Sequence, residues 1–192
     1  ELYARNWEGE FVKKFEYVFS TTNYFTNHET RNKYPNFSFH KSGNSNEKID
    51  VVIVPEGYTA EEMGKFVEDC KKFTTDMFAY APYTENKDKF NIWGVLAPSQ
   101  ESGVDIPADT VWRNTIMNFG YYTFDSERYL MTYDNKSVRD IAANAPYDQI
   151  YVLVNSDKYG GGAIYNYYNV SVNTNAKSAA ILIHEFGHGF VG

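Results

Sequence analysis

Two histidines flank a glutamate near the end of this 192-residue chain, in the segment His184-Glu185-Phe186-Gly187-His188. Histidines four residues apart on a helix project from one face about one turn apart, so a single metal ion can bind both imidazoles. The glutamate beside the first histidine can then take a proton from a water molecule that attacks a carbonyl group. This H-E-x-x-H pattern predicts zinc ligands at His184 and His188 and a catalytic general base at Glu185.

The residues around the motif predict the helix that would carry it, over 178–191. Its apolar residues recur at helical spacing on one face: Ala179, Leu182, Ile183, Phe186 and Phe190. The two histidines fall on the opposite face, so the helix should lie between a packed sheet and a cleft. The alternative is a pair of structural histidines on a buried helix. That alternative gives no reason for an adjacent carboxylate, because burying an unpaired charge is costly.

A catalytic zinc ion takes three protein ligands and a water molecule. The sequence continues for only Gly189-Phe190-Val191-Gly192 after the second histidine, and none of these side chains is a ligand. We therefore expect the third ligand to lie beyond Gly192. The chain is then the N-terminal part of a catalytic unit, and we expect this polypeptide by itself to be inactive.

Composition excludes several classes of partner. A formal net charge of −7 and a pI near 5.1, with no cluster of Lys and Arg, argue against a nucleic-acid or anionic-membrane partner. No apolar stretch approaches the ~20 residues of a membrane span. The single cysteine, Cys70, excludes an internal disulfide framework. The high aromatic content, 18%, suits either a dense core or a broad binding surface.

The order of predicted elements indicates an α/β fold. Residues 1–47 are rich in Asn, Thr, Lys and aromatics and form an entry segment, which is a candidate for the tail of an upstream domain. From residue 48 the pattern becomes regular, with buried strands at 49–54, 90–96 and 150–154, a helix over 59–78, an edge strand at 167–173 and the motif helix. Helical crossovers predict a mostly parallel sheet. The long segment 97–125 is a candidate for lining a cleft.

Several segments, in this order, resemble the M64 peptidase family, the IgA-peptidase-like zinc endopeptidases of bacteria. They are Val52-Ile53-Val54-Pro55-Glu56-Gly57-Tyr58-Thr59, Phe90-Asn91-Ile92-Trp93, Glu101-Ser102-Gly103-Val104, Ala145-Pro146-Tyr147-Asp148-Gln149-Ile150, Lys158-Tyr159-Gly160-Gly161-Gly162 and His184-Glu185-Phe186-Gly187-His188. The resemblance runs from about residue 49 to residue 192.

The resemblance implies a metzincin-like catalytic domain, a twisted and mostly parallel sheet with an antiparallel edge strand, in a secreted or cell-envelope protein. Residues 48–192 would be the N-terminal subdomain of that domain. The family's zinc ligands match His184 and His188, and its general base matches Glu185. In the family an acidic segment that follows would supply the third ligand, and it has no counterpart in this chain.

Metzincin-like peptidases bind the substrate backbone along an edge strand beside the metal. The resemblance therefore makes Tyr168, Asn169, Val170 and Ser171 candidate substrate-binding residues. An edge strand that pairs with another part of the same protein is the alternative.

The function we expect is that of a zinc-dependent endopeptidase acting on protein or peptide substrates by attack of an activated water. The alternative is a noncatalytic module that binds host protein or glycan on the same scaffold. His28 and His40 lie in the polar entry segment, where we expect solvated or packing roles rather than metal binding.

Overall fold

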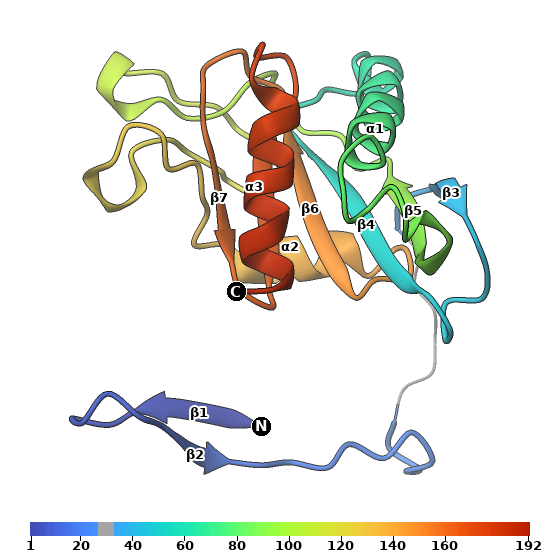
Figure 1. The fold of residues 1–192 in the computed structure, drawn as a ribbon. Coiled ribbons are helices and arrows are strands. Elements are labelled where there is room, and N and C mark those ends of the chain that lie inside the picture. The colour runs from blue at the N-terminus through green and yellow to red at the C-terminus, as the bar shows by residue number, and fades with distance from the viewer. Residues whose placement is uncertain (27–32) are drawn as a thin grey trace. The chain divides into compact units, whose positions relative to one another are not determined.

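The computed structural model describes residues 1–26 and 33–192 and divides the chain into two compact units, Glu1–Arg31 and Asn32–Gly192. The first unit is an antiparallel hairpin of β1 (Leu2–Arg5) and β2 (Phe11–Phe15), whose residues are exposed. The second unit contains the sheet and the three α-helices (Figure 1). His28 lies outside the described residues.

The sheet of the second unit has six strands in the order β3-β5-β4-β6-β8-β7. The strands are β3 (Asn36–Lys41), β4 (Ile49–Glu56), β5 (Phe90–Val95), β6 (Gln149–Val154), β7 (Gly161–Ile164) and β8 (Tyr168–Val172). The four inner strands pair in parallel, and β3 and β7 close the two edges in antiparallel orientation. The predicted mixed α/β class and the mainly parallel sheet are therefore confirmed.

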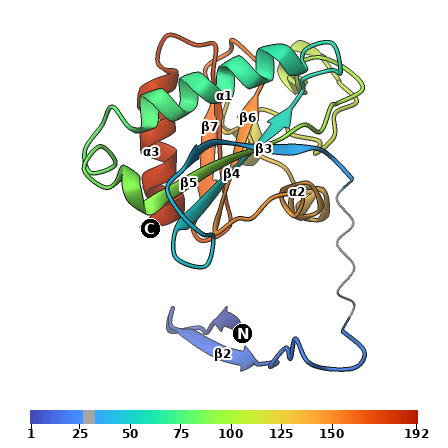
Figure 2. The same cartoon turned by 90° about the vertical axis from the view of Figure 1, so that its right-hand side faces the viewer.

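Helices cover both faces of the sheet. They are α1 (Met63–Met77), α2 (Asn135–Ala142) and α3 (Ser178–Phe190), and short 3-10 turns lie at Lys87–Lys89, Pro107–Asp109 and Thr123–Asp125. The two views show α1 and α3 on one face and α2 on the other (Figures 1 and 2). Among the described residues, no helix is both long and apolar enough to cross a membrane.

The alternation of side chains along β4 explains how one strand serves two cores. Val51 and Ile53 pack with α1 and α3 in one cluster, whereas Val52 and Val54 pack with α2 and the long loop in the other. All four are fully buried. A run of β-branched residues without polar alternation is typical of a strand covered on both faces, which is why the sequence pattern predicted this strand correctly.

The structure places the boundary between the two regions earlier than the sequence pattern does. Asn36–Lys41 was assigned to the entry segment, but it forms β3 and pairs with β5. The second unit accordingly begins at Asn32 rather than near residue 48. Within β3 the side chain of His40 contacts the carbonyl oxygen of Lys87 at 2.9 Å from its Nε2 atom, a packing role like the one expected for it.

The edge-strand interpretation of residues 167–173 is wrong. β8 pairs with β6 on one side and with β7 on the other, and every residue of β8 is buried. Its polar residues Asn169 and Ser171 do not face solvent, since Ser171 accepts a hydrogen bond from the buried Tyr151 hydroxyl at 2.9 Å. The edge on this side is β7, a strand of four residues that begins with Gly161 and Gly162.

Candidate active site

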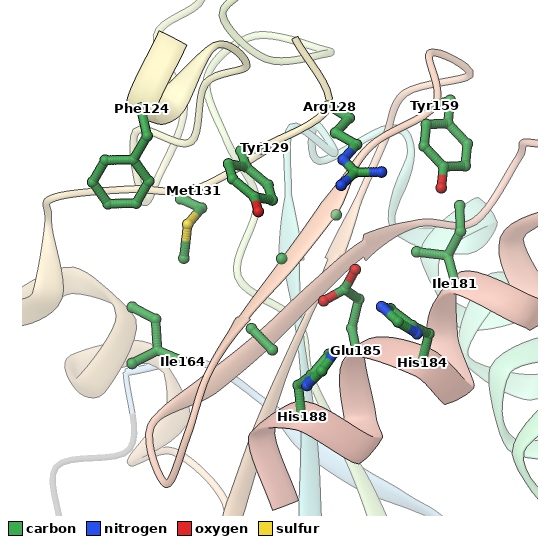
Figure 3. Close-up of a pocket in the computed structure, with 13 residues that line it drawn as sticks. Phe124, Arg128, Tyr129, Met131, Tyr159, Ile164, Ile181, His184, Glu185 and His188 are labelled. Carbon is green, nitrogen blue, oxygen red and sulfur yellow. The ribbon is translucent and has the colours of Figure 1, made fainter. Parts of the chain in front are cut away.

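Helix α3 presents the H-E-x-x-H residues to solvent because its apolar residues are held in the core. Leu182 and Phe186 are buried in the cluster beneath α1 and α3, which leaves His184 and His188 exposed on the other side. The two imidazole rings are 4.6 Å apart between centroids and lie nearly perpendicular, at 87°. Figure 3 shows both rings and the Glu185 carboxylate directed into one hollow. The structure thus brings together the three residues predicted from the motif.

That hollow is a cleft of about 540 Å³ between α3 and the wall opposite. Helix α3 contributes Ile181, His184, Glu185 and His188, and β7 contributes Gly161 to Ile164. The opposite wall consists of side chains from two loops: Phe124, Arg128, Tyr129, Met131 and Tyr159. Figure 3 shows Phe124, Met131 and Ile164 at one end of the cleft, and Arg128 and Tyr159 near the other.

Two glycines allow α3 to lie close to the sheet. A Cβ atom on Gly161 would lie 3.3 Å from Glu185 Cγ and 3.0 Å from Ile181 Cγ2, so this glycine leaves room for the Glu185 side chain against β7. A Cβ atom on Gly189 would lie 1.8 Å from Asn169 Oδ1. Gly189 therefore permits contact between α3 and β8 that any other residue would prevent. The close packing fixes the position of the histidine-bearing face relative to the edge strand.

The partly buried position of Glu185 changes its acidity. Burial raises the pKa of the Glu185 carboxyl above its ordinary value, and the nearby charges of His184, His188 and Arg128 offset part of that rise. A carboxyl group with a raised pKa accepts a proton more readily at neutral pH than an exposed one does. The site therefore contains a carboxylate that is suited to proton transfer and lies between two histidines in the sequence.

A buried carboxylate holds the loop that leads into the opposite wall. Glu56, at the end of β4, is fully buried and accepts hydrogen bonds from the backbone N–H groups of Met117 at 3.1 Å and Phe119 at 2.9 Å. It also accepts one from the Thr115 hydroxyl. Burial raises the pKa of Glu56 to about 7, and these hydrogen bonds counteract part of the effect. Residues 115–119 are thereby attached to the end of a central strand.

The wall then continues from this loop to the edge strand. Gly120 exchanges two backbone hydrogen bonds with Met131, at 3.0 and 3.1 Å. The next contacts are with β7, where Gly161 N–H donates to the Arg128 carbonyl at 3.1 Å and Leu130 N–H donates to the Gly161 carbonyl at 3.2 Å. The segment 128–131 is thus fixed beside the cleft by backbone pairing.

This pairing determines which part of the outer edge of β7 remains free. In an antiparallel pair, successive residues point their N–H and C=O groups alternately toward the partner and away from it. Since Gly161 points both groups away from β8, Ala163 must do the same two residues later. No backbone hydrogen bond to Ala163 comes from the loops in the described part of the chain. Ala163 therefore provides the free backbone edge at the cleft. The interior strand β8, which contains Tyr168, Asn169, Val170 and Ser171, has no free backbone edge.

The residues present fit a metal ion only in part. His184 and His188 supply two imidazole donors, which suit zinc. Within residues 1–26 and 33–192, no group of three or more His, Cys, Asp or Glu side chains is arranged to hold a metal. The described residues therefore offer two imidazole donors at this site, one fewer than the three protein ligands that a catalytic zinc ion takes.

Sequence patterns pointed to the long loop but missed most of the wall. The expected cleft-lining segment 97–125 includes one wall residue, Phe124, whereas Arg128, Tyr129 and Met131 follow that segment. The fifth, Tyr159, comes from the loop before β7. The only available signal was the density of aromatic residues over 119–133. It resembles the pattern of a core segment, and the exposure of Phe124 (73%) and Tyr133 (82%) in the structure distinguishes a surface segment from a core segment.

The comparisons with known proteins bear on the family of this chain. No curated protein matches the chain. Residues 37–192, which include the whole six-stranded sheet apart from Asn36 and all three helices, match the family model described as IgA Peptidase M64. A peptidase family implies protein or peptide substrates. Because the match covers most of the chain and includes the cleft with its His184, Glu185 and His188, this chain belongs to the IgA Peptidase M64 family.

Proposed function

We propose that this chain carries two zinc ligands and the general base of a zinc-dependent endopeptidase with a metzincin-like catalytic domain. The observation that carries the proposal is the convergence of His184, Glu185 and His188 in one cleft beside the edge strand of the sheet. Family membership supports the peptidase class. The histidine pair and its adjacent carboxylate support the metal dependence.

His184 and His188 would hold the metal through their imidazole nitrogens. When bound, a zinc ion polarises a carbonyl group and makes a water molecule more acidic. Glu185 would take the proton of the attacking water and deliver it to the leaving amine nitrogen as the peptide bond breaks. Its half-buried position against Gly161 limits its motion, which favours a fixed direction of proton transfer.

The substrate would bind as an extended strand at the outer edge of β7. Ala163 offers a free N–H and C=O there, and a peptide that pairs with it would lie between α3 and the opposite wall. Because the edge at Gly161 is taken by residues 128–130, the pairing would be short. Side-chain contacts with the wall would then supply much of the binding energy.

The test uses the full-length protein and compares Glu185→Gln with Glu61→Gln, a surface control. Metal analysis should find zinc in both, and circular dichroism should find both folded. Peptide cleavage should fall by about 10²–10⁴ only in Glu185→Gln, the range typical of losing a general base. Near-normal cleavage by zinc-loaded Glu185→Gln would rule out the base, and cleavage by metal-free protein would rule out the zinc dependence. Binding without any cleavage would favour the noncatalytic module.

A further inference from the structure

Arg128 is a cation in the cleft whose charge reaches the Glu185 carboxyl without forming an ion pair with it in the described part of the chain. Its side chain is exposed, and within residues 1–26 and 33–192 its guanidinium makes no ion pair and no hydrogen bond. Its Cζ atom lies 5.8 Å from the centroid of the Tyr129 ring. In a chain of net charge −7, where lysines pair repeatedly with carboxylates, a free arginine in a cleft has donors available for a ligand.

The backbone of Arg128 is fixed at the edge strand. Its carbonyl accepts the Gly161 N–H, and Leu130, two residues later, donates to the Gly161 carbonyl. The side chain therefore starts from a fixed point beside the cleft and extends into it, on the wall that faces Glu185 (Figure 3). A peptide lying along the cleft would pass between the two groups, which places the guanidinium next to the substrate.

The charges near Arg128 favour an anion. Arg128 and Tyr159 line both the cleft and a second hollow, whose other lining residues are Ser126, Glu127 and Lys158. The Lys158 ammonium lies 2.6 Å from the Glu127 carboxylate, so these two charges compensate each other. Arg128 forms no such pair within residues 1–26 and 33–192, and Glu185 is the acid that faces it across the cleft, so its N–H donors remain available to a ligand. The opposite end, at Phe124, Met131 and Ile164, is apolar and would not receive a charged group.

We propose that Arg128 is a specificity-determining residue that binds a carboxylate of the peptide at the Tyr159 end of the cleft. A guanidinium presents paired N–H donors that match the two oxygens of a carboxylate, and Tyr159 adds an aromatic face and a hydroxyl beside it. The carboxylate is either an Asp or Glu side chain or the C-terminal group of the peptide. This inference rests on the proposed function insofar as that function places a peptide in the cleft.

The test measures binding, so it requires neither metal nor cleavage. Fluorescence anisotropy on residues 1–192 compares short labelled peptides that are amidated and identical except for Glu or Gln at one scanned position. A further pair carries Gln throughout and ends in either a free carboxylate or an amide. Arg128→Gln removes the positive charge, and Arg128→Lys keeps the charge but lacks the paired N–H donors of a guanidinium. Lys158→Gln is the matched control, because it removes a neighbouring cation that is already paired.

We expect the unaltered protein to prefer one carboxylate-bearing peptide over its neutral twin by about three- to tenfold, as for a partly exposed ion pair. The preference should weaken at high salt, vanish in Arg128→Gln, persist in part in Arg128→Lys and persist in Lys158→Gln. Which peptide pair shows it identifies the source of the carboxylate.

Three results would overturn the proposal: equal binding or no binding of both members of every pair, a preference that survives Arg128→Gln, or one that Lys158→Gln removes equally. Circular dichroism checks that each variant is folded, and Arg128 is exposed, so its replacement should not disturb the core. If carboxylate preference is found but the full-length protein cleaves nothing, this inference stands and the proposed function fails.

Discussion

Replacing Gly189 with alanine should destabilise the protein strongly, although alanine is the better helix former. The added Cβ would lie 1.8 Å from Asn169 Oδ1, 2.6 Å from its Cγ and 2.9 Å from its Nδ2. Asn169 is fully buried, and its Nδ2 donates to the Ile150 carbonyl at 3.1 Å, so the amide cannot swing aside without losing that hydrogen bond. Either α3 moves away from β8 or a buried amide loses its partner.

The magnitude follows from these two costs. Overpacking a core typically costs about 1–3 kcal/mol, and a buried polar group without a partner costs about 1–3 kcal/mol. The higher helix propensity of alanine offsets up to about 1 kcal/mol of this cost. Because one of the two costs applies and the helix gain offsets part of it, we expect Gly189→Ala to lower the free energy of unfolding by about 1–3 kcal/mol relative to the unaltered protein.

Gly187 supplies a matched control on the same helix. A Cβ atom at Gly187 meets nothing within 4 Å, so Gly187→Ala should raise the free energy of unfolding by up to about 1 kcal/mol. Urea unfolding followed by circular dichroism measures both variants. A double-mutant cycle adds Asn169→Ala, which removes the clashing atom. In the Asn169→Ala protein, Gly189→Ala should lower the free energy of unfolding only slightly. Equal stability of the two alanine variants, or an unchanged penalty on the Asn169→Ala background, would refute the packing argument.

Three further predictions concern pH, the edge strand and the metal. Because the pKa of Glu56 rises to about 7 in the folded protein from an ordinary 4.5, its contribution to stability is fully present below about pH 4.5 and is lost as the pH rises through 7. Urea unfolding at pH 5 and pH 8 should show that the free energy of unfolding falls by about 3 kcal/mol more in the unaltered protein than in Glu56→Gln. Parallel pH profiles of the two proteins would contradict this. Ala163→Pro should weaken peptide binding without unfolding the protein, whereas Val170→Pro, in the interior strand, should unfold it. Circular dichroism measures the folding of both variants, and fluorescence anisotropy measures their peptide binding. Unaltered binding by Ala163→Pro would reject the placement of the substrate strand. Residues 1–192 should bind zinc weakly by equilibrium dialysis, since residues 1–26 and 33–192 offer two proposed ligands, His184 and His188, and no group of three. Tight one-to-one binding would require a third ligand from within the chain.

Local sequence was sufficient for the elements whose signal is periodic. The motif segment predicts a helix that exposes the two histidines, four residues apart, and buries the apolar residues on the opposite face. Helix α3 has this arrangement. The continuous β-branched run of β4 likewise determines a strand covered on both faces. These patterns arise from the geometry of one helix or strand, so they are visible before any tertiary contact is known.

Only the tertiary structure decided which strand is the edge and what faces the histidines. The polar residues of β8 suggested contact with water, but Ser171 bonds Tyr151 and Asn169 lies under Gly189, contacts that join residues about 20 positions apart. Arg128 reaches the cleft because its backbone pairs with Gly161, in a different segment of the chain. Such contacts depend on how strands are ordered in space. They leave no repeat in the sequence, so the free edge at β7 and the wall opposite α3 emerge only when the chain is folded.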